Sequence, residues 1–267
     1  MALPPGKAFL GVNVKQLFDL TGRVAIVSGG SIGLGRQMAE GLAEMGANLV
    51  LCARKRERCE EVADELHARG VQVLALGCDV RDRVTIQEVV DATLAKFGRI
   101  DILVNNAGVS WGAPVEEMTL EQWDNVLSTN LTGTFLFCQA AGKAMVAQRS
   151  GKIINLASVA GLGGASPELQ AIGYHASKGG VIAFTKDLAC KWAPHNIQVN
   201  AIAPGWFPTH MSDWVIQHRK DSLLTKIPLG RFGGDHDLKG AAVFLASAAS
   251  AYVTGHVLVV DGGQSAW

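Results

Sequence analysis

Two residues in the second half of the chain have the types and the spacing of a proton-transfer pair. Tyr174 and Lys178 lie four positions apart in the segment Tyr174-His175-Ala176-Ser177-Lys178, and on a helix this spacing places the phenol and the ammonium on one face. A nearby cation lowers the pKa of a tyrosine toward the working pH, so that the tyrosine can serve as a general acid or base. The pair predicts the chemistry of carbonyl reduction, with a surface pair at helical spacing as the alternative.

Ser158 offers a hydroxyl group for the same chemistry. It follows the apolar run Ile153–Ala157, which is expected to be a strand. The hydroxyl would then lie at the carboxyl end of that strand, where parallel sheets bind their ligands. A cap for the end of the strand is the alternative interpretation.

A glycine-rich turn, residues 28–35, could hold a phosphate group. It follows an apolar run and precedes a helix-length segment. Its glycines allow a tight turn, let a pyrophosphate approach the backbone, and leave the N–H groups of the helix N-terminus pointing at it. The turn lacks the commonest dinucleotide-binding spacing, G-x-G-x-x-G, so a merely tight turn is the alternative. The predicted cofactor-binding residues here are Gly29, Ser31, Ile32, Gly33, Leu34 and Gly35.

The residue after the second apolar run bears on the choice of cofactor. An acidic side chain there would accept hydrogen bonds from the ribose of NAD, whereas a guanidinium would pair with the 2′-phosphate of NADP. Arg54 stands at this position, so NADP(H) is favoured, with NAD(H) as a second option and a solvated basic turn as the alternative. Asp79 and Val80, after the third run, are expected at the adenine edge. Asp79 could also cap a helix that begins at Arg81.

Seven short apolar runs must position these residues. Their hydrophobicity is nearly continuous, as in strands covered on both faces by helices, and helix-length segments lie between them. The sequence predicts a single-domain doubly wound Rossmann-type α/β fold with a seven-stranded parallel sheet and helices on both faces. The predicted strands are Val24–Val27, Leu49–Ala53, Val71–Leu76, Ile100–Val104, Ile153–Ala157, Ile197–Ala203 and Val257–Val260. The predicted helices include Leu34–Met45, Arg58–Ala68, Val84–Phe97, Leu120–Ala147, Lys178–Trp192 and Leu238–Ala246.

Two stretches fall outside this alternation of strands and helices. Residues 1–20 are expected to be an N-terminal extension to a domain that spans residues 21–267. Residues 206–234 contain aromatic residues, prolines and a short amphipathic piece. Because long loops inside compact domains are commonly functional, this stretch is expected to be a lid over the substrate.

Composition excludes several classes of protein. Lys plus Arg and Asp plus Glu number 24 each, for a net charge of zero, so neither a nucleic-acid nor a membrane partner is expected. No apolar run approaches the ~20 residues of a membrane span, and no export signal is recognisable, so a cytoplasmic location is predicted. The five cysteines are expected to be reduced and buried. The histidines lack metal-ligand spacing, so no metal site is predicted.

Taken together, these motifs resemble those of the short-chain dehydrogenase/reductase family over residues 20–263. The resemblance implies that Tyr174 donates a proton to the carbonyl oxygen, Ser158 polarises that oxygen, and Lys178 binds the nicotinamide ribose while it lowers the pKa of Tyr174. Asn130 would hold a water in the proton relay; a polar residue that kinks a helix is its other interpretation. The cofactor would also contact Asn106, Ala107, Gly108, Pro204, Gly205, Phe207 and Thr209.

The substrate is less narrowly indicated. The loop Gly161–Gln170 is similar to that of gluconate 5-dehydrogenase-like members, which implies a sugar acid such as 5-ketogluconate, or another small ketone. Aromatic residues in the lid favour a partly apolar pocket. The predicted pocket residues are Ser158, Gly164, Tyr174, Trp206, Met211 and Trp214.

Two other functions stay open at this stage. A β-ketoacyl-thioester reductase would be expected to dock its carrier on basic residues near the lid, such as His218, Arg219 and Lys220. A non-catalytic cofactor-binding subunit or sensor belongs to a different class, and the intact set Ser158, Tyr174 and Lys178 argues against it. The resemblance further implies a homotetramer, with Leu120–Ala147, Lys178–Trp192 and Val257–Val260 at its interfaces.

Overall fold

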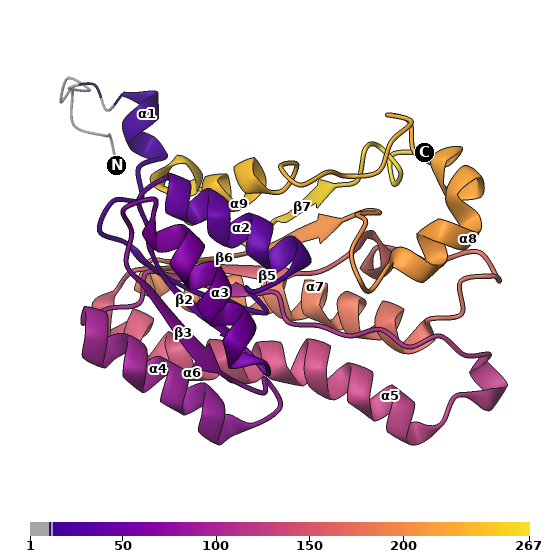
Figure 1. Ribbon diagram of the computed structural model, residues 1–267, viewed down its shortest axis with the longest axis horizontal. Coiled ribbons are helices and arrows are strands. Elements are labelled where there is room, and N and C mark those ends of the chain that lie inside the picture. Colours follow the sequence, from indigo (N-terminus) through magenta and orange to yellow (C-terminus); the bar gives the residue numbers. More distant parts are fainter. Residues whose placement is uncertain (1–10, 12) are drawn as a thin grey trace, which may run out of the picture.

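The fold is a single parallel sheet between two layers of helices (Figure 1). The computed structural model describes residue 11 and residues 13–267. Its strands follow the order β3-β2-β1-β4-β5-β6-β7, and every neighbouring pair is parallel. The predicted fold class is therefore confirmed. Strand order reverses between β1 and β4, which is where such sheets bind their ligands.

The seven strands lie close to the predicted runs. The third and fourth strands begin two residues later than predicted. The first two strands bury almost all of their residues. This pattern fits a sheet with helices on both faces. The bounds are β1 Val24–Ser28, β2 Asn48–Ala53, β3 Val73–Gly77, β4 Ile102–Asn105, β5 Gly151–Leu156, β6 Ile197–Pro204 and β7 Val257–Val260.

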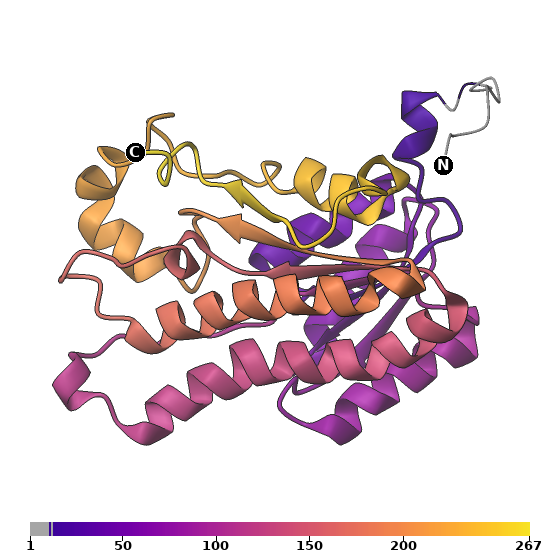
Figure 2. The same cartoon turned by 180° about the vertical axis from the view of Figure 1, so that it is seen from behind.

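Successive residues of each central strand supply the two cores. Ala25 and Val27 of β1 face one core, and Ile26 between them faces the other, because side chains alternate across a strand. The first core contains buried residues of α2, Gly33–Glu44, α3, Arg56–His67, and α9, Lys239–Ala246. The second contains residues of α4, Arg83–Phe97, α6, Gly133–Gln148, and α7, Ile172–Trp192 (Figure 2).

The helix predicted at Leu120–Ala147 is interrupted. It consists of α5, Leu120–Leu127, then a π-helical turn at Ser128–Thr132, and then α6. Short π-helical segments are frequently found at functional sites. This one contains Asn130, so the interpretation of Asn130 as a residue at a helix distortion is confirmed.

The N-terminal extension is partly integrated into the domain. Its residues 1–10 and 12 lie outside the described residues. The short helix α1, Val14–Leu17, has a capping box made by Asn13 and Gln16. Leu20 is buried in the first core, and its N–H donates to the Met45 carbonyl oxygen. The end of the predicted extension therefore belongs to the packed domain.

The structure bears on the predictions about the cysteines and about membrane spans. Cys190 is exposed, whereas the other four cysteines are buried and all five are free thiols; the prediction of burial was wrong for Cys190. It lies on the helix α7, where burial of one face leaves another in water. Within residues 11 and 13–267, no helix is long and apolar enough to span a membrane.

Candidate active site

The glycine-rich turn lies at the carboxyl end of β1, directly against the end of β4. Gly29 and Gly33 have positive φ angles of 65° and 53°, a conformation that glycine adopts without a Cβ penalty. The Asn106 amide donates to the carbonyl oxygens of Ser28 and Gly29, at 3.1 and 3.0 Å. The Ser28 hydroxyl accepts from the backbone N–H of Asn106, at 3.1 Å. These bonds fix the turn to the central strands.

Gly35 is required for the tightness of this turn. A Cβ atom on Gly35 would clash with the Gly29 carbonyl oxygen at 2.2 Å and with the Asn106 amide nitrogen at 2.3 Å. Ile32, the N-cap of α2, makes no side-chain cap bond, so the first N–H groups of the helix need another partner. A pyrophosphate would satisfy them. The turn therefore fits the phosphates of a dinucleotide.

The predicted proton-transfer pair is assembled on α7. The helix begins at Ile172, six residues earlier than predicted, and carries both Tyr174 and Lys178. The Lys178 Nζ lies 5.5 Å from the centroid of the Tyr174 ring, and it donates to the Leu156 carbonyl oxygen at 2.6 Å. Ser158, at the end of β5, is buried, and its hydroxyl also accepts from the Ala160 N–H at 3.1 Å. The cap interpretation of Ser158 is thus confirmed, and its hydroxyl lies just after the carboxyl end of β5.

The pKa of Tyr174 differs from the prediction. Burial raises the pKa of Tyr174, and the Ser158 hydroxyl only partly opposes this by lowering it. Burial also lowers the pKa of Lys178 to about 8. The predicted lowering of the Tyr174 pKa by Lys178 is therefore wrong for this state of the protein. Desolvation of the phenolate outweighs the hydrogen bond with the Ser158 hydroxyl.

Asn130 holds the segment that follows β4. Its Oδ1 accepts from the Val109 N–H at 2.8 Å, and its Nδ2 donates to the Val109 carbonyl oxygen at 2.9 Å. Gly108 lies between Asn130 and Lys178, because a Cβ there would lie 3.2 Å from Asn130 Oδ1 and 3.7 Å from Lys178 Nζ. The predicted site residues Asn130, Gly108 and Lys178 are thus brought together. Ala107 precedes Gly108, and its N–H donates to the Ser28 hydroxyl.

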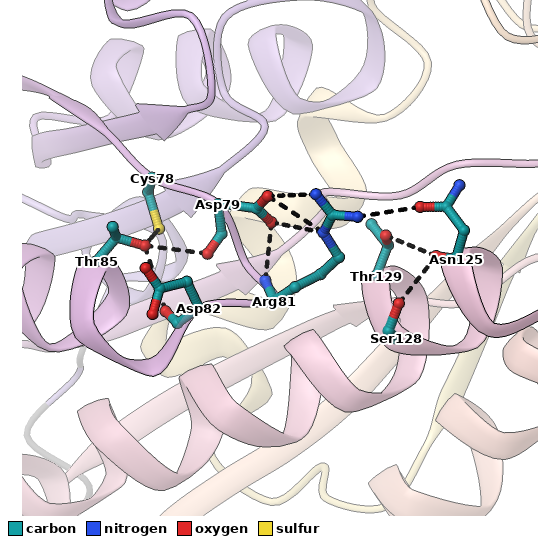
Figure 3. A network of polar contacts seen from close by, with 8 residues as sticks. All are labelled: Cys78, Asp79, Arg81, Asp82, Thr85, Asn125, Ser128 and Thr129. Carbon is teal, nitrogen blue, oxygen red and sulfur yellow. Dashed lines mark hydrogen bonds and ion pairs between the residues drawn. The ribbon is translucent and has the colours of Figure 1, made fainter. Parts of the chain in front are cut away.

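Asp79 is held by an arginine in the network of Figure 3. The Arg81 guanidinium donates to both carboxylate oxygens of Asp79, with a shortest distance of 2.6 Å, and also to Asn125 Oδ1 at 3.2 Å. These bonds lower the pKa of Asp79. The N-cap of α4 is Asp82, so the cap proposed for Asp79 was wrong. Val80 follows Asp79, is buried, and packs against Gly133.

The lid begins against the glycine-rich turn. Pro204 ends β6, and the Gly205 N–H donates to the Val260 carbonyl oxygen of β7 at 3.0 Å. Thr209 contacts Gly33, since a Cβ on Gly33 would lie 3.4 Å from its methyl group. Phe207 is 5% exposed and packs in the first core. Any contact of Phe207 with a cofactor is therefore left to its backbone.

The predicted pocket residues differ in their exposure. The helix α8, Asp213–Leu224, forms the centre of the lid. Trp206 is half-buried, whereas Met211 and Trp214 are exposed, and the Trp214 ring stacks on His218 with centroids 4.4 Å apart. Gly164 is exposed in the loop before α7. Two of the predicted pocket residues, Met211 and Trp214, thus lie largely in solvent.

Two functional positions were not predicted from the sequence. The Ser177 hydroxyl accepts from Asn130 Nδ2 at 3.0 Å and donates to the Tyr174 carbonyl oxygen at 2.8 Å, so it joins α7 to the π-helical turn. Asn155 of β5 accepts from the Asn105 amide and donates to Thr185, both at 2.9 Å. For Asn155, a polar residue inside the apolar run Ile153–Ala157 was the available signal, whereas Ser177 lies in no apolar run. In the described part of the chain, no group of acidic, His and Cys side chains could hold a metal.

Comparison with known proteins decides the family. The family model described as enoyl-(acyl carrier protein) reductase matches residues 29–265. The chain belongs to the short-chain dehydrogenase/reductase family. As a member of this family it is an oxidoreductase that acts on CH–OH and C=O groups. The predictions of family and enzyme class are confirmed.

Curated short-chain dehydrogenases similar to this chain have several names. Gluconate 5-dehydrogenase of Gluconobacter oxydans is 40% identical over 253 residues, which cover 93% of this chain and 96% of the relative. D-threitol dehydrogenase of Mycolicibacterium smegmatis is 42% identical and covers 93% and 95%. The 3-oxoacyl-[acyl-carrier-protein] reductase of Staphylococcus aureus is 40% identical and covers 90% and 97%.

Solved structures of short-chain dehydrogenases have the same fold. A short-chain type dehydrogenase/reductase from Mycobacterium marinum superposes with a TM-score of 0.92 at 38% identity, covering 95% of this chain and 99% of that chain. A gluconate 5-dehydrogenase from Burkholderia cenocepacia, in complex with NADP and tartrate, gives a TM-score of 0.91 at 36% identity, covering 96% and 100%. The cofactor prediction agrees with the NADP bound to this neighbour.

Proposed function

We propose that this protein interconverts a ketone and a secondary alcohol by reversible hydride transfer with NADP(H), and that Tyr174 is the general acid and base. The observation that carries this proposal is the juxtaposition of Tyr174 and Lys178 on α7, beside Ser158 at the end of β5. NADP(H) supplies or accepts the hydride when bound. The chain's own residues then handle the proton and the oxygen.

Each residue has a distinct role in this proposal. The glycine-rich turn and the N-terminus of α2 hold the pyrophosphate, and Arg54 holds the 2′-phosphate. Asp79 and Val80 border the adenine. In the reduction direction, the Ser158 hydroxyl donates a hydrogen bond to the ketone oxygen, and the Tyr174 phenol transfers its proton to that oxygen. Lys178 binds the nicotinamide ribose. Asn130 keeps the segment beside Lys178 in place.

A sugar acid or a small polyhydroxy ketone is the proposed substrate. Curated relatives that act on gluconate, threitol or 2-dehydro-3-deoxy-D-gluconate, according to their names, share 40 to 42% identity with this chain. A β-ketoacyl-thioester reductase is the second candidate, favoured by the 40% identity to the Staphylococcus aureus reductase. Two of the three basic residues proposed for carrier docking have partners here, since His218 stacks on Trp214 and Arg219 pairs with Glu168.

The test is NADPH oxidation by the purified protein with a panel of carbonyl compounds: 5-ketogluconate, β-ketoacyl thioesters, and small cyclic and aryl ketones. NADH is assayed in parallel. Tyr174→Phe should abolish turnover and retain NADPH binding, because the phenol oxygen is the only atom removed. Normal turnover by this variant would refute the proposed mechanism. Silence of the wild type on the whole panel, with NADPH bound, would favour the sensor function.

A homotetramer in the cytoplasm is part of the proposal. The surface between α6 and α7 forms an apolar groove, and β7 is the last strand of the sheet order. Burial of these surfaces against further copies would remove apolar area from water. Light scattering should give the mass of four chains, and a monomer would contradict it. The groove is lined by Phe135, Cys138, Gln139, Gly142, Lys143, Val146, Phe184, Leu188 and Trp192.

A further inference from the structure

The lid contains an arginine at a break in its helix. The backbone of α8 leaves helical geometry at Arg219, with φ −135° and ψ 18°. The Arg219 side chain is 30% exposed, whereas the other ion-paired arginines of the described chain are 38% to 60% exposed. It is thus the arginine among them that is most withdrawn from solvent.

Arg219 reaches from the lid to the loop that joins two predicted catalytic residues. Its Nη1 donates to Glu168 Oε2 at 2.8 Å. Glu168 belongs to the loop between Ser158 and Tyr174, and the Gln170 carbonyl oxygen of that loop accepts from the Ala113 N–H at 2.8 Å, which anchors the loop to the segment after β4. In both views, α8 and the start of α7 lie on the same side of the molecule (Figure 1 and Figure 2).

The ion pair leaves most of the Arg219 guanidinium available. A guanidinium has five N–H donors in a fork that matches a carboxylate, and within residues 13–267 the structure gives Arg219 one side-chain bond, to one oxygen of Glu168. Glu168 is 67% exposed, so its carboxylate can move into solvent at little cost. An exposed pair of this kind contributes little to stability. A second carboxylate could therefore replace Glu168 on Arg219 and bind it through two hydrogen bonds.

We propose that Arg219 selects ketone and alcohol substrates that carry a carboxylate, and that Glu168 occupies Arg219 until such a substrate displaces it. The inference rests on the proposed function, because it assigns a substrate class to the same site. Two other basic residues in or next to the lid helix are less suited to this role. His218 stacks on Trp214, and Arg231 is held within its own segment by Asp237 at 2.6 Å and by the Phe232 carbonyl oxygen.

The test compares substrates that differ only in the carboxylate. 5-Ketogluconate and L-sorbose share their ketone and hydroxyl groups, but L-sorbose has CH₂OH in place of the carboxylate. Arg219→Gln should raise KM for 5-ketogluconate about tenfold to a hundredfold, the range for hydrogen bonds to a charged group, and leave KM for L-sorbose unchanged. Arg219→Lys should recover part of the loss. Arg231→Gln is the matched control and should change neither KM.

Removal of the charge of Glu168 should change KM in the opposite direction. Glu168→Gln should lower KM for 5-ketogluconate several-fold, because the substrate no longer competes with an internal carboxylate. In the double variant with Arg219→Gln this gain should disappear, since the two residues act on each other. An unchanged KM in Glu168→Gln, or the same gain in both backgrounds, would overturn the competition between Glu168 and substrate.

Binding provides a readout that does not depend on turnover. Titration calorimetry of the NADPH-loaded protein, in which an alcohol cannot be oxidised, with D-gluconate and with its uncharged counterpart D-glucitol should show tighter binding of D-gluconate, and Arg219→Gln should remove the difference. Equal binding of both ligands by the wild type would overturn the inference even if ketone reduction is found. Conversely, selective D-gluconate binding without turnover of any ketone would retain the inference and refute the proposed function.

Discussion

Arg54 gives the sharpest test of cofactor choice. It follows β2 directly, is exposed, and lies close enough to Asp79 for its charge to lower the pKa of that carboxyl group. Among the described side chains it has no ion-pair or hydrogen-bond partner. By contrast, Arg36 pairs with Glu40, and Arg56 pairs with Glu60. The Arg54 guanidinium is thus available for a 2′-phosphate at the adenosine end of the site.

The size of the effect follows from this environment. Asp79 is already neutralised by Arg81, so Arg54 presents a nearly uncompensated positive charge to the phosphate. A hydrogen bond to a charged group contributes about 1.5–3 kcal/mol, which corresponds to a ten- to hundredfold change in kcat/KM. Arg54→Gln should lower kcat/KM for NADPH by about this factor. Arg54→Asp should lower kcat/KM for NADPH further, because it replaces attraction by repulsion. The new carboxylate would also accept hydrogen bonds from the ribose hydroxyls of NADH, so NADH should not show this loss.

The assay measures kcat/KM for NADPH and for NADH with one saturating ketone, at two salt concentrations. The loss in Arg54→Asp should be confined to NADPH and should shrink at high salt, because screening weakens interactions between exposed charges. Arg56→Gln removes a neighbouring arginine that already has a partner, and it should change neither cofactor. Equal losses for NADPH and NADH in Arg54→Asp would refute the assignment of Arg54 to the 2′-phosphate.

Three further predictions concern NADPH binding at the glycine-rich turn, the pH dependence of proton transfer by Tyr174, and the stability contributed by Asn155. Gly35→Ala should weaken NADPH binding at least tenfold in a fluorescence titration, since its Cβ would clash with the turn, while Gly240→Ala on α9, where nothing lies within 4 Å, should not. Because the pKa of Tyr174 is raised, alcohol oxidation should accelerate as the pH rises above neutrality while ketone reduction stays constant near neutrality; a flat oxidation profile would contradict this. Asn155→Leu should lower the free energy of unfolding in urea by about 2–4 kcal/mol, because Thr185 and a second buried amide lose their partner; an unchanged midpoint would show that the network is dispensable.

The sequence predicted the sheet well because each strand is buried on both faces. A strand such as Val24–Ser28 leaves no polar face, so its apolar run is nearly continuous and its ends are marked by the glycines that follow. The predicted proton-transfer pair was equally local. Tyr174 and Lys178 belong to one helix, so their spacing alone determines that they share a face.

Features that depend on distant parts of the chain were not predictable in this way. The π-helical turn at Ser128–Thr132 depends on bonds from Asn130 to Val109 and to Ser177, which lie 21 and 47 residues away. The pair Arg219 and Glu168 spans 51 residues and joins the helix α8 to an irregular loop. The loop has no periodicity from which its path could be inferred. Burial at Tyr174 likewise arises from packing, so spacing predicted the wrong direction for its pKa.

The raised pKa of Tyr174 affects ketone reduction and alcohol oxidation differently. A phenol that stays protonated at neutral pH is ready to give a proton to a ketone oxygen, whereas the same phenol cannot accept a proton from an alcohol until it is ionised. Lys178, with its pKa lowered to about 8 by burial, is still mostly charged at pH 7 and donates to the Leu156 carbonyl oxygen. Its ammonium can therefore stabilise a phenolate that forms as the proton leaves. In the proposed mechanism, alcohol oxidation therefore requires ionisation of Tyr174, whereas ketone reduction does not, so only oxidation should accelerate as the pH rises.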